Sequence, residues 1–240
     1  VWTGMFGRWA KAGSADKGEE RGAIMVDNGS AALCEDDAVA ALRRGEPVIL
    51  PTDTVFGLAV APQYADGPDV LYRLKGRPSS KPVAWLVGGV GDLELFGTDV
   101  PAYARALARR YWPGPLTLIV RAGEQVPLAY SSAERTIGLR MPDDSLVLRI
   151  ISRTASPLAC TSANPSGDPA PMRFSDIDPA LASRVPVALD DAQQKSGVPS
   201  TVVDCTGDMP NVLRQGAVTA QQVADAVNAA GPAEERGGLR

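Results

Sequence analysis

Three cationic side chains lie within seven residues in the segment KGRPSSKP. They are Lys75, Arg77 and Lys81, and no acidic residue lies between them. Arginine offers a planar fork of N–H donors and lysine a mobile point charge, so this cluster can neutralise a polyphosphate or a departing pyrophosphate. A solvated surface loop often has the same composition, and the cluster alone does not separate the two interpretations.

Two other segments place small polar groups next to apolar runs. ACTSANPSG carries Ser162 and Asn164 after an expected strand, at the edge where open α/β sheets bind ligands. PSTVVD begins with Pro199 and places Ser200 just before another expected strand. Both segments are also typical of ordinary Asx or Ser turns, so neither establishes a site by itself.

Polar side chains interrupt apolar runs at two further places. Asp53 and Thr54 lie within PTDTVFGL, and Arg140 ends the apolar run of TIGLRMP. A polar group in a strand-like run needs a partner, which can be backbone, water or a ligand. Arg140 can pair with Asp143 or Asp144 at the surface, or it can bind the carboxylate of a ligand. The sequence leaves both possibilities open.

Several enzyme classes are excluded by residues and motifs that the chain lacks. It contains no histidine, which excludes Ser-His-Asp and Cys-His catalysis and His-based metal sites. Neither a Gly-x-x-x-x-Gly-Lys-Ser/Thr loop nor a Gly-x-Gly-x-x-Gly turn is present. Cys34, Cys160 and Cys205 are widely separated and odd in number, so they predict neither a disulfide framework nor a metal site.

The composition is that of a globular protein with one substantial core: 45% of the 240 residues are hydrophobic and 22% are charged. A net charge of −4 argues against a main function in coating nucleic acid. The apolar runs are far shorter than the roughly 20 residues that cross a bilayer, and the N-terminal segment lacks the apolar core of a secretory signal. We therefore expect a cytoplasmic protein with no membrane partner.

Hydrophobic spacing and turn residues predict the elements that position these side chains. Helices are expected at residues 34–44, 68–74, 101–111 and 146–152, and after a Thr219 cap up to Gly231. Strands are expected at residues 48–50, 83–87, 116–121, 136–140, 157–160, 185–189 and 201–205. Residues 76–82 should form a loop.

The order of these elements predicts an α/β fold with a single domain. Strict βαβ alternation fails in the middle of the chain, where strands follow one another closely, so we expect a twisted mixed β-sheet flanked by helices. Residues 1–24 and 232–240 are expected to be flexible segments. The domain should then span residues 25–231.

Seven segments, taken together and in order, resemble the YrdC/TsaC family of L-threonylcarbamoyladenylate synthases across about residues 45–216. They are PTDTVFGL, KGRPSSKP, YWPGPLT, TIGLRMP, TSANPSG, PSTVVD and LRQG. The resemblance implies a compact YrdC-like α/β domain that converts L-threonine, bicarbonate and ATP to L-threonylcarbamoyladenylate and pyrophosphate. It also implies that partner proteins, the threonylcarbamoyl transferase complex, then modify the adenosine beside the anticodon of certain tRNAs.

The resemblance assigns roles to residues by their position in these motifs. It implies that Arg77 and Lys81, with Lys75 beside them, hold the ATP phosphates. The other implied nucleotide-binding residues are Thr136, Ser162, Asn164, Ala170 (through its backbone) and Arg214. The implied threonine-binding residues are Thr54, Arg140, Cys160 and Ser200, with Arg140 pairing the threonine carboxylate.

The chemistry expected from the resemblance uses no covalent nucleophile and no protein-held metal. The carbamate of threonine would attack the α-phosphate of ATP, and Mg²⁺ would be carried with ATP by phosphate and water. Positioning and charge neutralisation would then supply the catalysis.

The chain departs from the family pattern at two positions. Leu86 occupies a position where some relatives have histidine, and Phe56 replaces a common tyrosine. Longer members carry an additional C-terminal domain, so the chain is expected to be the short, single-domain form.

Three alternatives stay open at this stage. A carbamoyl-adenylate-forming module, as in hydrogenase maturation factors, would use a related chemistry. An RNA-binding module would use a basic concave face, although aromatic residues total only 5% and stacking platforms are not evident. The chain could also keep the fold without the activity.

Overall fold

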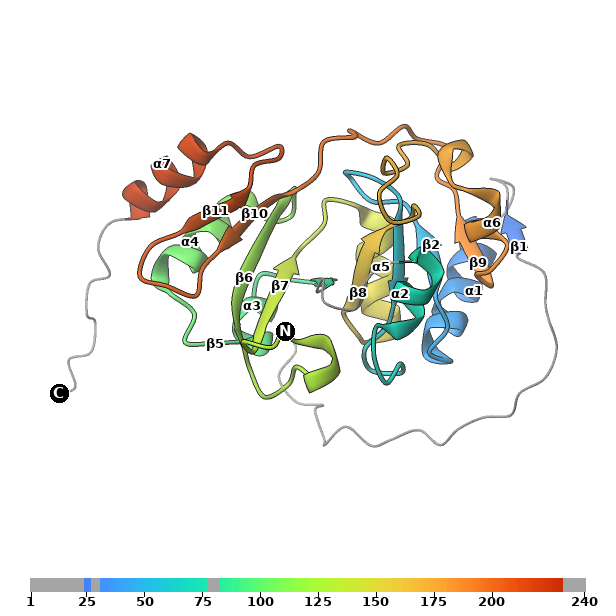
Figure 1. The fold of residues 1–240 in the computed structure, drawn as a ribbon, viewed down its shortest axis with the longest axis horizontal. Helices are drawn as coiled ribbons and strands as arrows, with labels where there is room; N and C mark the ends of the chain where they lie inside the picture. Colours follow the sequence, from blue (N-terminus) through green and yellow to red (C-terminus); the bar gives the residue numbers. More distant parts are fainter. Residues whose placement is uncertain (1–23, 27–30, 77–82, 231–240) are drawn as a thin grey trace.

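A mixed β-sheet runs across the molecule from β1 at one side to β11 at the other (Figure 1). The computed structural model describes residues 24–26, 31–76 and 83–230. The strands in these ranges are β1 (Ile24–Val26), β2 (Val48–Leu50), β3 (Gly57–Val60), β4 (Ala84–Leu86), β5 (Gly97–Thr98), β6 (Leu116–Ala122), β7 (Thr136–Arg140), β8 (Leu158–Ser162), β9 (Val187–Leu189), β10 (Thr201–Asp204) and β11 (Asn211–Arg214).

Helices lie on both faces of this sheet. The α-helices of the described residues are α1 (Ala31–Arg43), α2 (Asp69–Lys75), α3 (Asp92–Phe96), α4 (Ala102–Tyr111), α5 (Ser145–Thr154), α6 (Pro179–Ala182) and α7 (Ala220–Ala230). Short 3-10 helices occur at Leu128–Tyr130 and Phe174–Asp176. None of the helices in the described ranges is long and apolar enough to cross a membrane.

The strand order is β1-β9-β2-β3-β8-β4-β7-β6-β10-β11, with β5 paired to β6. The pairs β1–β9, β2–β9, β4–β7 and β6–β10 are parallel. The pairs β2–β3, β3–β8, β4–β8, β5–β6, β6–β7 and β10–β11 are antiparallel. The predicted mixed sheet is confirmed.

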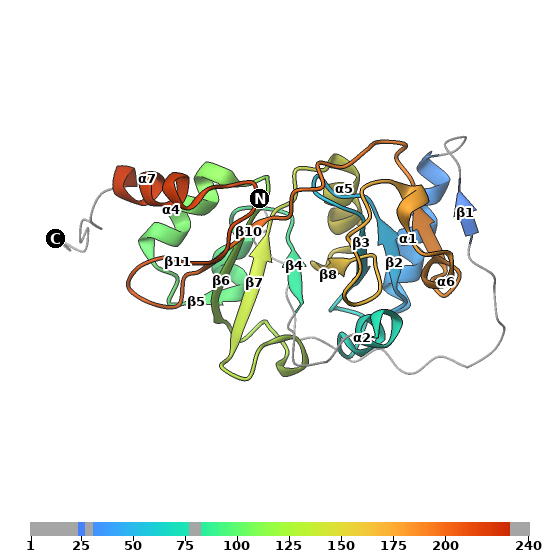
Figure 2. The same cartoon turned by 45° about the horizontal axis from the view of Figure 1, so that its top comes forward.

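Successive residues of the central strands belong to two separate cores, because side chains alternate between the faces of a sheet. Trp85 of β4 packs in the larger core with residues of α2, α3, α4 and α7, whereas Leu86 packs in the smaller core with α1 and α5. Leu58 and Ala59 of β3 divide in the same way. Figure 2 shows α2 and α5 on opposite sides of β3 and β8.

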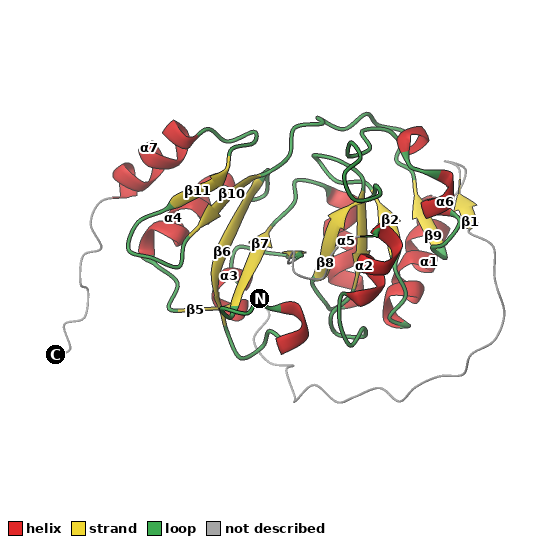
Figure 3. Ribbon diagram, viewed as in Figure 1, coloured by secondary structure: helices red, strands yellow, loops and turns green. Residues whose placement is uncertain are grey.

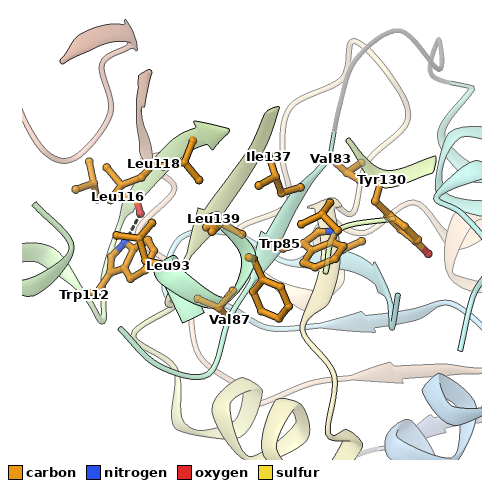
Figure 4. Close-up of a cluster of buried hydrophobic side chains, with 14 of the residues drawn as sticks. Val83, Trp85, Val87, Leu93, Trp112, Leu116, Leu118, Tyr130, Ile137 and Leu139 are labelled. Atoms are coloured by element: carbon orange, nitrogen blue, oxygen red, sulfur yellow. Dashed lines mark hydrogen bonds between the residues drawn. The ribbon is translucent and has the colours of Figure 1, made fainter. Parts of the chain in front are cut away.

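Aromatic side chains pack together at the centre of the larger core. Trp85 meets Phe96 and Tyr130 edge to face, with ring centres 5.1 and 5.7 Å apart. Its neighbours Ile137 and Leu139 come from β7, and Trp112 donates its indole N–H to the carbonyl oxygen of Leu116 at 2.7 Å (Figure 4). This core fixes the positions of β4, β6 and β7, which the candidate site shares.

The smaller core covers only part of its face. It contains residues of β2, β3, β4, β8 and β9, and no residue of β6, β7 or β10 among the described positions. By register, Thr136, Gly138 and Arg140 of β7 share this face with Thr117 of β6 and Cys160 of β8. The polar half of this face, over β6, β7 and β10, is where the candidate site lies.

Three helix ends are set by identifiable residues, of which the Thr219 cap was predicted from the sequence. Gly76, in the left-handed conformation with φ of 59°, ends α2. The Asp144 carboxylate accepts the backbone N–H of Val147 at 3.0 Å and caps α5. Thr219 and Gln222 exchange backbone-to-side-chain hydrogen bonds of 2.8 and 3.1 Å at the start of α7.

All predicted helices and strands of the described ranges are present, with ends shifted by up to three residues. The prediction missed β1, β3, β5, β11, α3 and α6, which are short elements. The expected flexible segments, the helix end at Gly231 and positions 77–82 of the expected loop lie outside the described residues, apart from Ile24 in β1.

Candidate functional site

Arg140, the last residue of β7, lies at the centre of a polar cluster and is only 7% exposed. Its Nε donates to the carbonyl oxygen of Gly114 at 3.0 Å, and its Nη1 donates to the Thr54 hydroxyl at 3.0 Å. Its Nη2 forms an ion pair with Oδ1 of Asp53 at 2.5 Å. The guanidinium is therefore held at three corners by two segments, the loop that contains Asp53 and Thr54 and the turn that contains Gly114.

This geometry corrects one prediction. The surface ion pair considered for Arg140, with Asp143 or Asp144, does not form; its partner is Asp53. Asp144 is drawn into capping α5, because the first N–H groups of a helix need acceptors. The other possibility, that Arg140 binds the carboxylate of a ligand, remains compatible with the structure.

Arg140 keeps donors for such a ligand. A guanidinium carries five N–H groups, one on Nε and two on each terminal nitrogen. The three hydrogen bonds described above use one N–H group on each of the three nitrogens. One N–H on each terminal nitrogen is left by these bonds, and a carboxylate can accept one from each.

The loop that supplies Asp53 and Thr54 is fixed by its own hydrogen bonds. The Thr52 hydroxyl donates to the carbonyl oxygen of Val55 at 2.6 Å and lies 3.1 Å from the Thr54 hydroxyl. The Thr54 carbonyl oxygen accepts the N–H of Gly197 at 2.9 Å. Thr52 and Thr54 are both buried, so the polar residues of PTDTVFGL satisfy one another and Arg140.

Ser200, the residue before β10, and Arg214 of β11 join this cluster. The buried Ser200 hydroxyl lies 2.9 Å from that of Thr117, and Nη2 of Arg214 donates to the Ser200 carbonyl oxygen at 2.8 Å and to its hydroxyl at 3.2 Å. The pKa of Arg214 is lowered, first by desolvation of its guanidinium and then by the charge of Arg140. Two cations thus face the same region, as expected of an anion site.

Cys160 lies half-buried on β8, packed against the smaller core. Burial raises the pKa of its thiol to about 12, although the charges of Arg140 and Lys75 act in the opposite direction. The thiol therefore stays protonated near neutral pH, which makes it a poor nucleophile. A neighbouring glycine, Gly57 of β3, lies so close that an added Cβ would come within 2.6 Å of the Cys160 sulfur.

A second cluster forms where α2 ends beside the TSANPSG loop. The ammonium of Lys75 donates to the carbonyl oxygens of Ser162 and Asn164, the latter at 2.5 Å, and lies 3.3 Å from the Asn164 side-chain oxygen. Lys75 is only 5% exposed. The Asn164 amide donates to the carbonyl oxygens of Pro165 and Asp168 at 2.8 and 2.7 Å. Lys75 and Asn164 therefore brace this loop from inside.

The remaining predicted nucleotide residues are spread around these clusters. Thr136 begins β7, four residues or roughly 13 Å along the strand from Arg140, and its hydroxyl lies 2.8 Å from that of Ser132. Ala170 is exposed and precedes Pro171, whose carbonyl oxygen accepts the N–H of Phe56 at 3.0 Å. Arg77 and Lys81 lie outside the described residues.

The structure thus brings the predicted residues into two groups. Thr54, Arg140, Ser200 and Arg214 form the first, so Arg214, predicted for the nucleotide, meets residues predicted for threonine. Lys75, Ser162 and Asn164 form the second. Cys160 lies between them on β8, two residues before Ser162 on the same face.

One buried residue of the site region was missed by sequence reasoning. Lys195 is 6% exposed; its ammonium forms an ion pair with Asp191, lies 4.0 Å from Oδ2 of Asp144 and lies 5.5 Å from the ring centre of Phe56. It belongs to the long loop from β9 to β10 (Figure 3). A single lysine in a polar loop carries no spacing signal, so only the fold reveals its burial.

The two departures from the family pattern are both buried. Leu86 is 4% exposed and pairs in register with Arg140. Phe56 is fully buried and meets Phe174 edge to face, with ring centres 6.0 Å apart. Within the described ranges, no group of three or more His, Cys, Asp or Glu residues could hold a metal ion.

These features define a mixed α/β protein with a candidate anion site on a partly uncovered sheet face. The chain belongs to the Sua5/YciO/YrdC family, whose model carries the description "Telomere recombination" and matches residues 40–216. This range contains all seven segments of the predicted resemblance.

Named relatives are similar over most of the chain. Threonylcarbamoyl-AMP synthase of Bacillus subtilis is 35% identical over 187 residues, which cover 78% of this chain and 54% of that protein. A putative threonylcarbamoyl-AMP synthase of Mycobacterium tuberculosis H37Rv is 35% identical over 188 residues, covering 78% and 86%. The chain spans about half the length of the Bacillus subtilis relative and of a Pyrococcus abyssi relative.

Solved structures share the fold. The P. abyssi Sua5 structure complexed with L-threonine has a TM-score of 0.73 and 31% identity, covering 79% of this chain and 56% of that one. E. coli YciO has a TM-score of 0.72 and 23% identity, covering 82% and 95%, and supports the fold alone.

Proposed function

We propose that the chain synthesises L-threonylcarbamoyladenylate from L-threonine, bicarbonate and ATP, releasing pyrophosphate. It would act as a nucleotidyltransferase. The observation that carries the proposal is the buried Arg140 guanidinium, which is positioned at three corners and retains an N–H on each terminal nitrogen for a carboxylate. The names of the relatives and the threonine-bound Sua5 structure supply the substrate class.

Threonine would bind at the first group of residues. Its carboxylate would accept from Arg140, while the hydroxyls of Thr54 and Ser200 line the same cluster and can exchange partners with the substrate. Cys160 would contribute shape from β8, because its protonated thiol offers no charge. Burial of these groups would strengthen each contact by excluding water.

ATP would bind along the second group. Ser162, Asn164, Thr136 and the backbone of Ala170 would contact the nucleotide, and Arg77 and Lys81 would neutralise the phosphates. Lys75 would act mainly by holding the Ser162 to Asn164 loop in position, because its ammonium already donates to that loop. The Arg214 guanidinium beside Ser200 would connect the two substrates.

The reaction would proceed by alignment of substrates without a covalent enzyme intermediate. Threonine is carboxylated by bicarbonate, and an oxygen of the resulting carbamate attacks the α-phosphate of ATP. Placing two anions side by side needs cations on both, which Arg140 and Arg214 would provide.

Mg²⁺ would enter with the triphosphate, bound mostly by phosphate oxygens and water. Such an ion supplies charge neutralisation at the leaving pyrophosphate. The Ser162 hydroxyl and the Asn164 side-chain oxygen lie 3.4 and 3.3 Å from the Lys75 ammonium, which fits an ion bound through the substrate and its water and not directly by these residues.

The product would serve threonylcarbamoyl modification of the adenosine beside the anticodon of tRNA. We propose a functional link to the transferase complex that delivers the group, and a cytoplasmic location where tRNA is modified.

The decisive measurement is pyrophosphate release from ATP with bicarbonate, with and without L-threonine, and with L-serine as the control amino acid. Threonine-dependent release, weaker with serine, is the expected result. Pyrophosphate release that does not depend on threonine but is stimulated by carbamoyl phosphate would establish the carbamoyl-adenylate reaction instead. Binding of tRNA with no release under any condition would favour an RNA-binding module.

A further inference from the structure

The carboxylate of Asp53 is paired with Arg140 and is not one of the proposed ligands of ATP or threonine. Its Oδ1 lies 2.5 Å from Nη2 of Arg140, and the two side chains are 15% and 8% exposed. The guanidinium is also held by Thr54 and by the carbonyl oxygen of Gly114. Because these two contacts already orient Arg140, the Asp53 carboxylate is available for a second function.

An α-amino acid presents one cation and one anion on the same carbon, and this pair is complementary to an arginine–carboxylate pair. If the substrate carboxylate accepts the remaining N–H groups of Arg140, its ammonium lies beside the neighbouring carboxylate. Asp53 and the substrate carboxylate would then share the guanidinium, and the substrate ammonium would neutralise Asp53. Once the guanidinium is shared with the substrate carboxylate, a second cation beside the partly buried Asp53 restores the charge balance.

We propose that Asp53 binds the α-amino group of the amino-acid substrate and accepts its proton when the nitrogen is carboxylated. This inference rests on the proposed function. It concerns the step before adenylation, in which the amine must lose a proton to become a nucleophile.

The atoms of this step balance. The ammonium transfers one proton to Asp53 and becomes an amine. The nitrogen lone pair forms a bond to the carbon of bicarbonate, a C–O bond of bicarbonate breaks, and its hydroxyl leaves as water with the second amine proton. The products are the carbamate anion, water and protonated Asp53, which returns its proton to solvent through its exposed edge.

The test separates amine recognition from mere orientation of Arg140. Dissociation constants are measured by calorimetry for L-threonine and for (R)-3-hydroxybutyrate, which lacks the amino group and keeps the carboxylate and hydroxyl. The proteins are the wild type, Asp53→Asn, Asp53→Glu, and Asp143→Asn as a control at an exposed aspartate near the same strand end.

We expect the wild type and Asp143→Asn to bind threonine at least about tenfold more tightly than (R)-3-hydroxybutyrate, an increment of about 1.4 kcal/mol. Asp53→Asn should lose most of that preference by weakening threonine alone, and Asp53→Glu should regain part of it. The inference would be overturned if Asp53→Asn weakened the binding of both ligands equally, or if it left the preference for threonine over (R)-3-hydroxybutyrate unchanged.

Failure of the proposed function gives a different pattern. A wild-type protein that binds neither ligand, and releases no pyrophosphate with threonine, would refute the proposed function itself. Thermal unfolding of Asp53→Asn, which keeps nearly the shape of aspartate, identifies any loss that comes from misfolding. The rate at saturating threonine provides the second readout: in Asp53→Asn it should rise with pH more steeply than in the wild type, because solvent must then take the amine proton.

Discussion

The ammonium of Lys75 donates to the carbonyl oxygen of Asn164 at 2.5 Å, although the two residues are 89 positions apart. This contact joins the end of α2 to the loop after β8 and places a buried cation inside a predicted phosphate-binding segment. Lys75 therefore has a structural role that its motif did not indicate.

Lys75→Met should lower the free energy of unfolding by about 2 to 3 kcal/mol, because the carbonyl oxygens of Ser162 and Asn164 lose a charged donor. The KM for ATP should rise as the loop loosens. Urea unfolding and steady-state kinetics measure the two effects. The exposed Arg73 of the same helix provides the control, and Arg73→Met should change neither. Full stability in Lys75→Met would contradict the bracing role.

Arg140→Lys keeps the positive charge and removes the planar fork. Because one ammonium cannot replace the contacts to Asp53, Thr54 and Gly114 and still bind a carboxylate, the KM for threonine should rise at least about tenfold, with a smaller effect on ATP. Arg121→Lys, at an exposed position of β6, is the matched control. An unchanged KM for threonine in Arg140→Lys would show that Arg140 does not bind the threonine carboxylate.

Lys195→Met should destabilise the fold by on the order of 3 kcal/mol, because Asp144 and Asp191 would lose their buried cation. Desolvation already raises the pKa of Asp144, while Lys195 lowers it. A carboxyl group whose pKa is higher in the folded than in the unfolded state destabilises the fold when it is ionised. Its contribution to the free energy of unfolding is therefore most favourable at low pH and is lost as pH rises through the folded-state pKa.

The loss in Lys195→Met should therefore be larger at neutral pH than at an acidic pH at which Asp144 is protonated. Urea unfolding at the two pH values measures the difference. Lys195→Arg, which retains a cation, should be much less affected. A loss independent of pH would show that packing against Phe56, and not charge, is what Lys195 supplies.

Gly57→Ala should destabilise the protein by about 1 to 3 kcal/mol, because the new Cβ would lie 2.6 Å from the Cys160 sulfur. Adding Cys160→Ala should recover part of this loss by removing the sulfur. Thermal unfolding of the two single variants and the double variant measures the coupling. Gly89→Ala is the control, since nothing lies within 4 Å of its added Cβ. If the stability losses of the two single variants added up in the double variant, the structure would be relieving the clash by a shift that does not involve the Cys160 sulfur.

Much of the fold follows from local signals in the sequence. Apolar runs, the left-handed Gly76 and the Thr219 cap predict most helices and strands, because these features act within a few residues. The short elements β3 and β11 escape such reasoning. β3 is a run of only four residues, and it becomes a strand by pairing with β2 and β8.

The sequence by itself determined the order of the elements, the family, and which residue types are available for chemistry, because motifs and local spacing are properties of neighbouring residues. Only the tertiary structure decided which of them meet. Arg140 is paired with Asp53, 87 positions away, and not with the aspartates next to it. Lys195 is buried and Lys75 braces a loop. The physical reason is that these partners are set by strand crossovers in a mixed sheet, where contacts depend on the whole chain's path and not on spacing along it.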